Sequence, residues 1–152
     1  MVLVLVEGKR LNWSQSVKYL GLNFDPILTF GSHVDLTCLK ASKYIRILYP
    51  LMNRRSPLSI ANKKLLYKAV FRSIMTYGAP VWSDCAKTHM RKLQVIQNKC
   101  LKLAFNQPFF FSTAELHKLA GVELISDFCG RISSRFFHGC QFSENPNIVN
   151  LT

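Results

Sequence analysis

Long apolar runs are missing from this sequence of 152 residues. The apolar stretch at positions 1–6 is short, whereas a membrane-spanning helix needs about 20 apolar residues and a secretion signal an apolar core of at least ~7. We therefore expect no membrane segment, no membrane partner and no secretion signal.

Paired metal ligands and paired carboxylates are missing as well. The cysteines are odd in number and irregularly spaced, at positions 38, 85, 100, 129 and 140. This pattern favours reduced thiols in an intracellular chain over a disulfide scaffold or a structural zinc site. The aspartates are isolated, at positions 25, 35, 84 and 127, so no carboxylate pair can hold the two metal ions of a phosphoryl-transfer centre. We expect no catalytic residue, no metal ligand and no cofactor in this chain.

Basic residues dominate the charge. The chain has 20 Lys and Arg against 8 Asp and Glu, a formal charge of +12. Between Lys40 and Lys102 the only acid is Asp84. Apolar residues make up 49% of the chain, which excludes a disordered basic tail. Because uncompensated positive charge destabilises a fold, it favours a polyanionic partner such as nucleic acid over a role in solubility alone.

The N-terminal region has the composition of β-strands. Residues 1–6 and 17–24 predict the two strands of one hairpin, with Trp13 and the residues after it in the connection. Helical periodicity begins near Ser32 and continues to Pro50, and its expected apolar stripe comprises Val34, Leu39, Ile45 and Leu48.

Two basic helices are expected in the centre of the chain. The first should begin at Ser56-Pro57 and end near Tyr77, before Gly78 and Pro80. Its expected apolar side comprises Leu66, Ala69, Val70 and Ile74, and its basic stripe comprises Lys64, Lys68 and Arg72. The second, residues 87–105, segregates its apolar residues from a basic side that comprises Lys87, Arg91, Lys92, Lys99 and Lys102.

The remaining residues predict a short helix and a last helix. A capping box at residues 112–115 predicts the short helix, which ends at Gly121, and Ser126 is a candidate cap for the last one. The aromatic residues 109–111 favour a hydrophobic plug between helices over a base-stacking platform. The loop pair Arg54-Arg55 suits phosphate contact and a plain exposed pair equally well.

Four segments, in this order, resemble one known family. They read VKYLGLNFD, LMNRRSPLSIANKKLLYKAV, MTYGAPVWSDCAKTHMRKLQVIQNKCLKL and STAELHKLAGV. Together they resemble the C-terminal part of the reverse transcriptase of jockey-type non-LTR retrotransposons. Residues 109–111 depart from the pattern, because relatives tend to have a tryptophan and then a basic residue there.

The resemblance implies a domain plan. Residues 1–28 would be a palm remnant whose Tyr19, Leu20 and Gly21 resemble the family's primer grip. Residues 29–106 would be a basic helical thumb and residues 107–152 a C-terminal helical tail. The family's catalytic aspartates, which use Mg²⁺ in the intact polymerase, lie upstream of the Tyr-Leu-Gly segment, so the chain would not be an enzyme on its own.

The expected protein is therefore mainly α-helical, with a short N-terminal β-hairpin followed by a helical thumb bundle and C-terminal helices. As a polymerase fragment it would hold an RNA–DNA hybrid or another duplex by its phosphates, in the nucleus or the cytoplasm, and its partners would be the missing palm and fingers. One wall of the binding groove would comprise Lys64, Lys68 and Arg72, the other Arg91, Lys92, Lys99 and Lys102, with Arg54 and Arg55 nearby. The main alternative is a retroelement relic with no binding activity. Complementation of a catalytic palm in trans and a weaker helix-turn-helix hypothesis also stay open.

Overall fold

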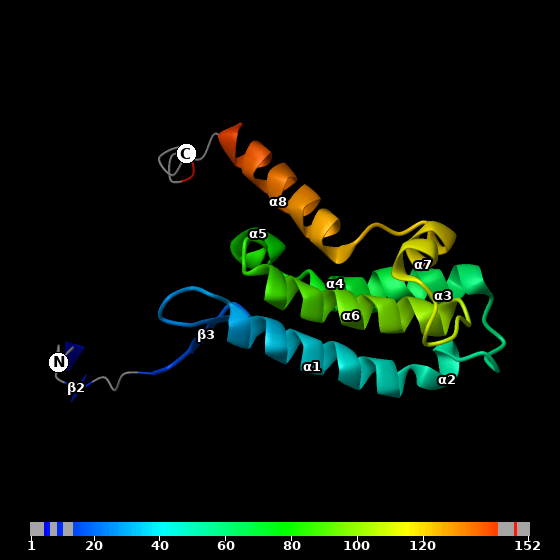
Figure 1. Cartoon of the computed structure of the whole chain (residues 1–152). Helices are drawn as coiled ribbons and strands as arrows, with labels where there is room; N and C mark the ends of the chain where they lie inside the picture. The colour runs from blue at the N-terminus through cyan, green and yellow to red at the C-terminus, as the bar shows by residue number, and fades with distance from the viewer. Residues whose placement is uncertain (1–4, 7–8, 11–13, 143–147, 149–152) are drawn as a thin grey trace.

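A computed structural model describes residues 5–6, 9–10, 14–142 and 148 (Figure 1). Short strands come first, and helices occupy most of the chain from Gly31 onward. In chain order the elements are β1 (Leu5–Val6), β2 (Lys9–Arg10), β3 (Val17–Tyr19), β4 (Leu22–Phe24), α1 (Gly31–Ile47), α2 (Tyr49–Met52), α3 (Ile60–Leu66), the π-helix η1 (Tyr67–Arg72), α4 (Ser73–Met75), α5 (Ala79–Trp82), α6 (Lys87–Ala104), α7 (Thr113–Ala120) and α8 (Ile125–Gln141). The expected class, mainly α with an N-terminal hairpin, is confirmed.

The strand pairing differs from the expectation. Residues 17–24 form a complete antiparallel hairpin by themselves, in which β3 pairs with β4. The turn residues Leu20 and Gly21 have φ angles of 46° and 82°, and two positive values in succession are typical of the tight turns that join twisted strands. β1 pairs with β2 in a separate sheet, so the prediction that residues 1–6 pair with residues 17–24 is wrong. Residues 1–4 and Trp13 lie outside the described residues.

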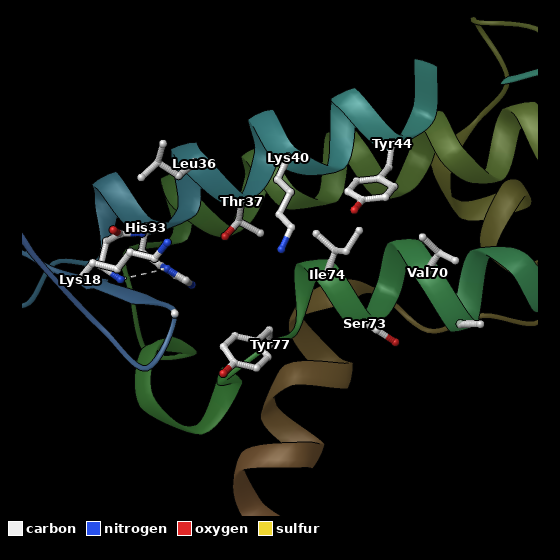
Figure 2. A pocket seen from close by; sticks show the side chains of 13 residues that line it. Lys18, His33, Leu36, Thr37, Lys40, Tyr44, Val70, Ser73, Ile74 and Tyr77 are labelled. Atoms are coloured by element: carbon white, nitrogen blue, oxygen red, sulfur yellow. Dashed lines mark hydrogen bonds between the residues drawn. The ribbon is translucent and has the colours of Figure 1, made fainter. Parts of the chain in front are cut away.

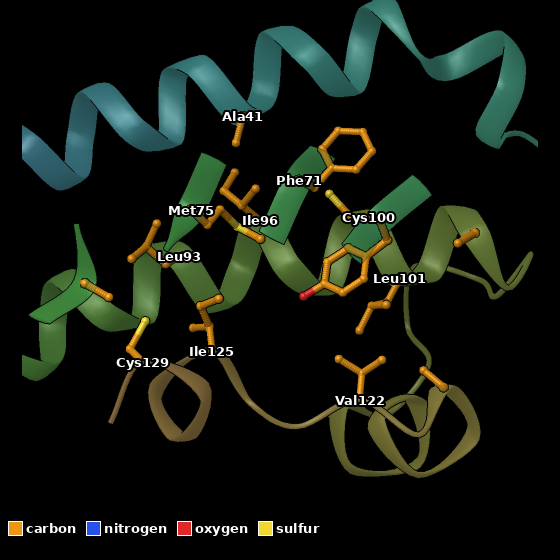
Figure 3. Close-up of a cluster of buried hydrophobic side chains, with 14 of the residues drawn as sticks. Ala41, Phe71, Met75, Leu93, Ile96, Cys100, Leu101, Val122, Ile125 and Cys129 are labelled. Carbon is orange, nitrogen blue, oxygen red and sulfur yellow. The ribbon is translucent and has the colours of Figure 1, made fainter. Parts of the chain in front are cut away.

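The helices from α1 to α8 form three layers (Figure 1). α1 lies on one side of a middle layer made of α6 and the continuous helix of α3, η1 and α4. α7 and α8 lie on the other side, and α8 packs against α5 and α6. Apolar side chains from all three layers meet in the core, which includes Ala41, Phe71, Leu93, Leu101 and Ile125 (Figure 3).

The helix of α3, η1 and α4 buries a different side from the expected one. Its buried residues recur every fourth position, at Lys63, Tyr67, Phe71 and Met75. A π-helix has wider turns than an α-helix, so the spacing of the buried side follows a longer period than the one assumed. The expected apolar side, comprising Leu66, Ala69, Val70 and Ile74, is only partly buried, and Ala69 is exposed.

Several helix boundaries also differ. α3 begins after Ser59, whose side chain accepts a hydrogen bond from the Asn62 amide, and not at Ser56-Pro57. Pro80 lies in the first turn of α5 and begins that helix. Within the predicted stripe of α1, Leu39 is exposed, whereas Val34 is buried and Ala41 takes the adjacent buried position.

The last two helices begin without the expected side-chain caps. Ser112 precedes α7 without a side-chain capping bond, and α8 begins after Leu124 instead of Ser126. α6 matches its prediction to within one residue, and α7 ends before Gly121 as expected. None of the described helices combines the length and the apolar character that crossing a bilayer requires.

Candidate nucleic-acid interface

A cleft of about 680 Å³ lies between the β3–β4 hairpin, α1 and the helix of η1 and α4 (Figure 2). Its lining carries hydroxyl, amide, imidazole and ammonium groups together with aliphatic carbon. The polar side chains are those of Lys18, Asn23, His33, Thr37, Lys40, Tyr44, Ser73 and Tyr77. Hydroxyl and ammonium donors of this kind are the groups that proteins use to contact the phosphates and sugars of nucleic acids.

Contacts with the helices fix the hairpin at the mouth of this cleft. The Tyr77 hydroxyl donates to the Leu20 carbonyl over 2.9 Å, and the backbone amide of Asn23 donates to Nδ1 of His33 over 3.4 Å. Burial lowers the pKa of His33, so its ring is neutral near pH 7 and Nδ1 can act as the acceptor. Leu22, on the same hairpin, is buried in the core. The turn that carries Leu20 is therefore held against the end of α4.

The primer-grip-like residues lie at this turn. Gly21 lines the cleft, and a Cβ atom added to it would lie 3.1 Å from Cε1 of Tyr77. Tyr19 and Leu20 are exposed. The structure thus brings Gly21 to the cleft and leaves the two larger side chains facing outward.

The solvent-facing side of α1, termed here the outer face of α1, combines cations with apolar side chains. It comprises Leu36, Leu39, Lys40, Lys43, Arg46 and Ile47, which line a second, shallow groove. All six are exposed. Leu36 and Lys40 also line the first cleft, so the two grooves are continuous along α1. The binding residues expected from the sequence did not include the cations of α1.

Most described carboxylates are engaged elsewhere. Asp35, on α1, forms an ion pair of 2.5 Å with Lys92 of α6. Asp25 accepts hydrogen bonds from the amides of Thr29 and Phe30, and these bonds lower its pKa. Among the described residues, no ion pair involves a cation on the outer face of α1. That face therefore keeps its positive charge.

The two predicted basic stripes do not face one another across a groove. The buried sides of η1 and α6 are in contact, because Gln97 donates from Nε2 to the Tyr67 hydroxyl over 2.8 Å. Lys64, Lys68 and Arg72 are partly buried beside that contact, and the Arg72 guanidinium lies 4.2 Å from the centre of the Phe128 ring of α8. The charged side of α6 points away from its buried side and thus away from η1.

The predicted cations of α6 differ in their availability. Arg91 and Lys99 are exposed, whereas Lys92 is paired with Asp35. Lys102 donates from Nζ to the Phe109 carbonyl over 2.5 Å. A role in nucleic-acid binding stays a prediction for all of these residues.

The Arg54-Arg55 pair is exposed on a loop with a fixed base. Asn53 accepts, at Oδ1, a hydrogen bond of 2.7 Å from the Arg55 amide. Its carbonyl accepts one of the same length from Nζ of Lys63, whose side chain is buried. Sequence reasoning missed Lys63, because a lysine among several basic residues gives no signal that it turns inward.

Described groups that could support other chemistry do not gather at one site. In the described part of the chain, no cluster of three or more His, Cys, Asp or Glu side chains could hold a metal ion. Burial raises the pKa of both Cys100 and Cys129 to about 12, so these thiols are poor nucleophiles.

Similarity to known proteins covers most of the chain. It is 28% identical over 131 residues to the probable RNA-directed DNA polymerase from transposon BS of Drosophila melanogaster, which covers 86% of this chain and 14% of that protein. It is 26% identical over 145 residues to the RNA-directed DNA polymerase from mobile element jockey of the same species, covering 95% of this chain and 16% of that protein. The jockey polymerase of Drosophila funebris is 29% identical over 146 residues, with the same coverage.

The chain thus spans about one seventh of the length of these relatives. No model of a known protein family matches it, and no solved structure does. The resemblance carried by the four sequence segments is confirmed.

Proposed function

We propose that this chain grips the backbone of a template–primer duplex. The premise is that its homologues are RNA-directed DNA polymerases of jockey-type and related non-LTR transposons. The substrate class would be an RNA–DNA hybrid or a similar duplex, and the chain would supply binding without catalysis. The observation that carries the proposal is the outer face of α1, with its three exposed cations and no ion pair among the described residues.

The composition of this face suits a duplex backbone. Lys40, Lys43 and Arg46 are three residues apart, which corresponds to about 4.5 Å of rise along a helix at each step. Charged groups so placed can contact several phosphates and release their counterions. Exposed aliphatic side chains line the same groove, at Leu36, Leu39 and Ile47. A wide, shallow minor groove such as that of A-form helices admits this mixture, with carbon against sugars and cations against the flanking phosphates.

The cleft beside the hairpin would extend the contact. Lys18 approaches from β3, Lys40 approaches from α1, and Thr37 of α1 adds a hydroxyl (Figure 2). These donors suit the sugar and phosphate oxygens of one strand. Neither ammonium nor hydroxyl donors on a backbone select a base sequence, so the grip would be independent of sequence.

The palm and fingers of a polymerase are the proposed protein partners. Apolar side chains are exposed around the hairpin, at Val17, Tyr19 and Leu20, and on the connection to α1, at Ile27 and Leu28. An apolar patch of this kind is typical of an interaction site. Addition of the purified chain to a separately expressed catalytic part, followed by a polymerase assay, tests whether the two associate in trans. If the chain does not change the rate of DNA synthesis and does not co-elute with the catalytic part in size-exclusion chromatography, this partner is contradicted.

A charge-reversal pair tests the duplex grip. The triple variant Lys40→Glu/Lys43→Glu/Arg46→Glu removes the cations of the outer face of α1. Its matched control, Lys87→Glu/Lys118→Glu/Arg135→Glu, changes the net charge equally at exposed positions elsewhere. We expect the first variant to lose affinity for a labelled RNA–DNA hybrid by tenfold or more, and the control to lose much less, because close phosphate contacts outweigh screened long-range charge.

Equal losses in the two variants would contradict an interface on α1 and would indicate binding by net charge alone. No binding by the unmodified chain at low salt would favour the relic hypothesis.

A further inference from the structure

Two phenylalanine rings project from the connection between α6 and α7. The Phe111 amide donates to the Pro108 carbonyl over 3.1 Å, so Phe109 and Phe110 occupy the two corner positions of a tight turn. Their exposed fractions are 89% and 87%. Turn corners usually carry small or polar residues, and the sequence-based expectation of a hydrophobic plug is wrong for these two residues. Phe111 alone packs against the core.

The base of this turn is fixed from both sides. Nζ of Lys102 donates a hydrogen bond to the Phe109 carbonyl, and the backbone amide of Gln107 donates to the Lys102 carbonyl over 2.8 Å. Phe105 is buried before the turn, as Phe111 is partly buried after it. The two rings are therefore presented to solvent by an anchored turn, which lowers the entropic cost of binding a flat partner.

One cation lies beside the rings, and others lie at the same end of the bundle. Nζ of Lys102 lies 5.5 Å from the centre of the Phe109 ring, and Lys99, one helical turn earlier, is exposed. The α2–α3 connection, which carries Arg54 and Arg55, lies at the same end of the bundle as this turn (Figure 1). The nearest acid along the chain is Glu115, in the first turn of α7. Flat rings beside several cations match a ligand that has flat bases on an anionic backbone, better than they match an uncharged apolar protein surface.

We propose that Phe109 and Phe110 form a stacking platform for unpaired nucleobases, at the point where a single strand leaves the duplex. Lys99 and Lys102 would neutralise the phosphates of that strand. The inference rests on the proposed duplex grip, because α1 leads toward the end of the bundle where this turn lies (Figure 1). A duplex lying along α1 would direct its single-stranded extension to the turn.

Three probes separate stacking from charge. They are a blunt RNA–DNA hybrid, the same hybrid with a single-stranded extension, and the same hybrid with an abasic extension of equal length. The two extended probes carry equal numbers of phosphates, so any difference in their affinity reports on the bases. We expect the unmodified chain to bind the base-bearing extension about tenfold more tightly than the abasic one.

The variant Phe109→Ala/Phe110→Ala should abolish that difference while it binds the blunt hybrid as the unmodified chain does. The matched control is Phe136→Ala/Phe137→Ala, an aromatic pair on α8 that is also more than half exposed, and it should keep the difference. A fluorescent purine analogue in the extension should be quenched by the unmodified chain and by Phe109→Trp/Phe110→Trp, but not by the alanine variant.

The outcomes are distinct. Equal affinity of the unmodified chain for base-bearing and abasic extensions, with firm binding of the blunt hybrid, would overturn the platform alone. Failure to bind any of the three probes would overturn the duplex grip itself.

Discussion

Replacement of Gly78 by alanine should destabilise the protein more than the same change at Gly121, which is also a left-handed helix cap. Gly78 has a φ angle of 65°, and a side chain in that region costs about 1–2 kcal/mol. A Cβ atom at this position would also lie only 2.8 Å from Cδ2 of Leu22. Because Leu22 is buried, this overlap adds about 1–3 kcal/mol of overpacking. We therefore expect Gly78→Ala to lower the free energy of unfolding by about 2–5 kcal/mol.

Two other glycines calibrate the effect. Gly121 has a φ angle of 55°, but its nearest neighbour would be Nζ of Lys64 at 3.4 Å, so Gly121→Ala should cost only the ~1–2 kcal/mol of backbone strain. Gly130 lies inside α8, where an added Cβ atom would meet no atom of another residue's side chain or of another element within 4 Å, so Gly130→Ala should stabilise the protein by up to ~1 kcal/mol through helix propensity.

Urea denaturation followed by circular dichroism measures all three. The double variant Gly78→Ala/Leu22→Ala should be less destabilised than the sum of the two single variants, with a coupling of at least ~1 kcal/mol in a double-mutant cycle. Equal costs at Gly78 and Gly121, or additive effects in the cycle, would refute the docking of the hairpin on the turn before α5.

Three further results are expected. Tyr67→Phe should lower the unfolding free energy by about 1 kcal/mol, since it removes the one hydrogen bond that Tyr67 accepts from Gln97. Gln97→Leu should cost more, because it leaves two acceptors without a donor. A larger loss for Tyr67→Phe than for Gln97→Leu in urea melts would contradict this network. The thiols of Cys100 and Cys129, with pKa values of about 12, should resist alkylation by iodoacetamide at pH 8 in the native chain and react after denaturation. Mass spectrometry measures the alkylation, and modified Cys100 or Cys129 in the native chain would be inconsistent with their burial. The hydrogen bonds that Asp25 accepts lower its pKa in the folded chain. They should therefore stabilise the protein at a pH above the ordinary pKa of 3.8, and this stabilisation should be lost as the pH falls through the lowered pKa. The melting temperature of Asp25→Asn should accordingly lie below that of the unmodified chain at neutral pH and match it in acid, and a difference independent of pH would argue against the bonds.

Where the sequence follows the α-helical period, its prediction matches the structure. α6 separates its charged and apolar residues cleanly, and its buried residues, among them Leu93 and Leu101, lie where the period places them. The helix that contains η1 does not follow this period. The π-helix η1 buries Phe71 four residues after Tyr67, whereas the 3.6-residue period selects Val70.

Local conformations without a sequence signal account for other differences. Leu20 has a positive φ angle, which is uncommon for a residue with a bulky side chain, so a turn inside residues 17–24 is not evident from the sequence. At the candidate interface, the abundance of cations was predictable, but their distribution was not. It depends on partners outside the helix that carries each cation, such as Asp35 of α1 for Lys92 and the Phe109 carbonyl of the following turn for Lys102.

The most direct test of the proposed duplex grip is the salt dependence of binding. The purified chain is titrated against a labelled RNA–DNA hybrid at several salt concentrations, in parallel with the Lys40→Glu/Lys43→Glu/Arg46→Glu variant. A backbone grip predicts a linear fall of log affinity with log salt, and a slope that is shallower in the variant by about 2.7, at about 0.9 for each of three lost phosphate contacts. Binding that does not change with salt, or a variant with the slope of the unmodified chain, would contradict it.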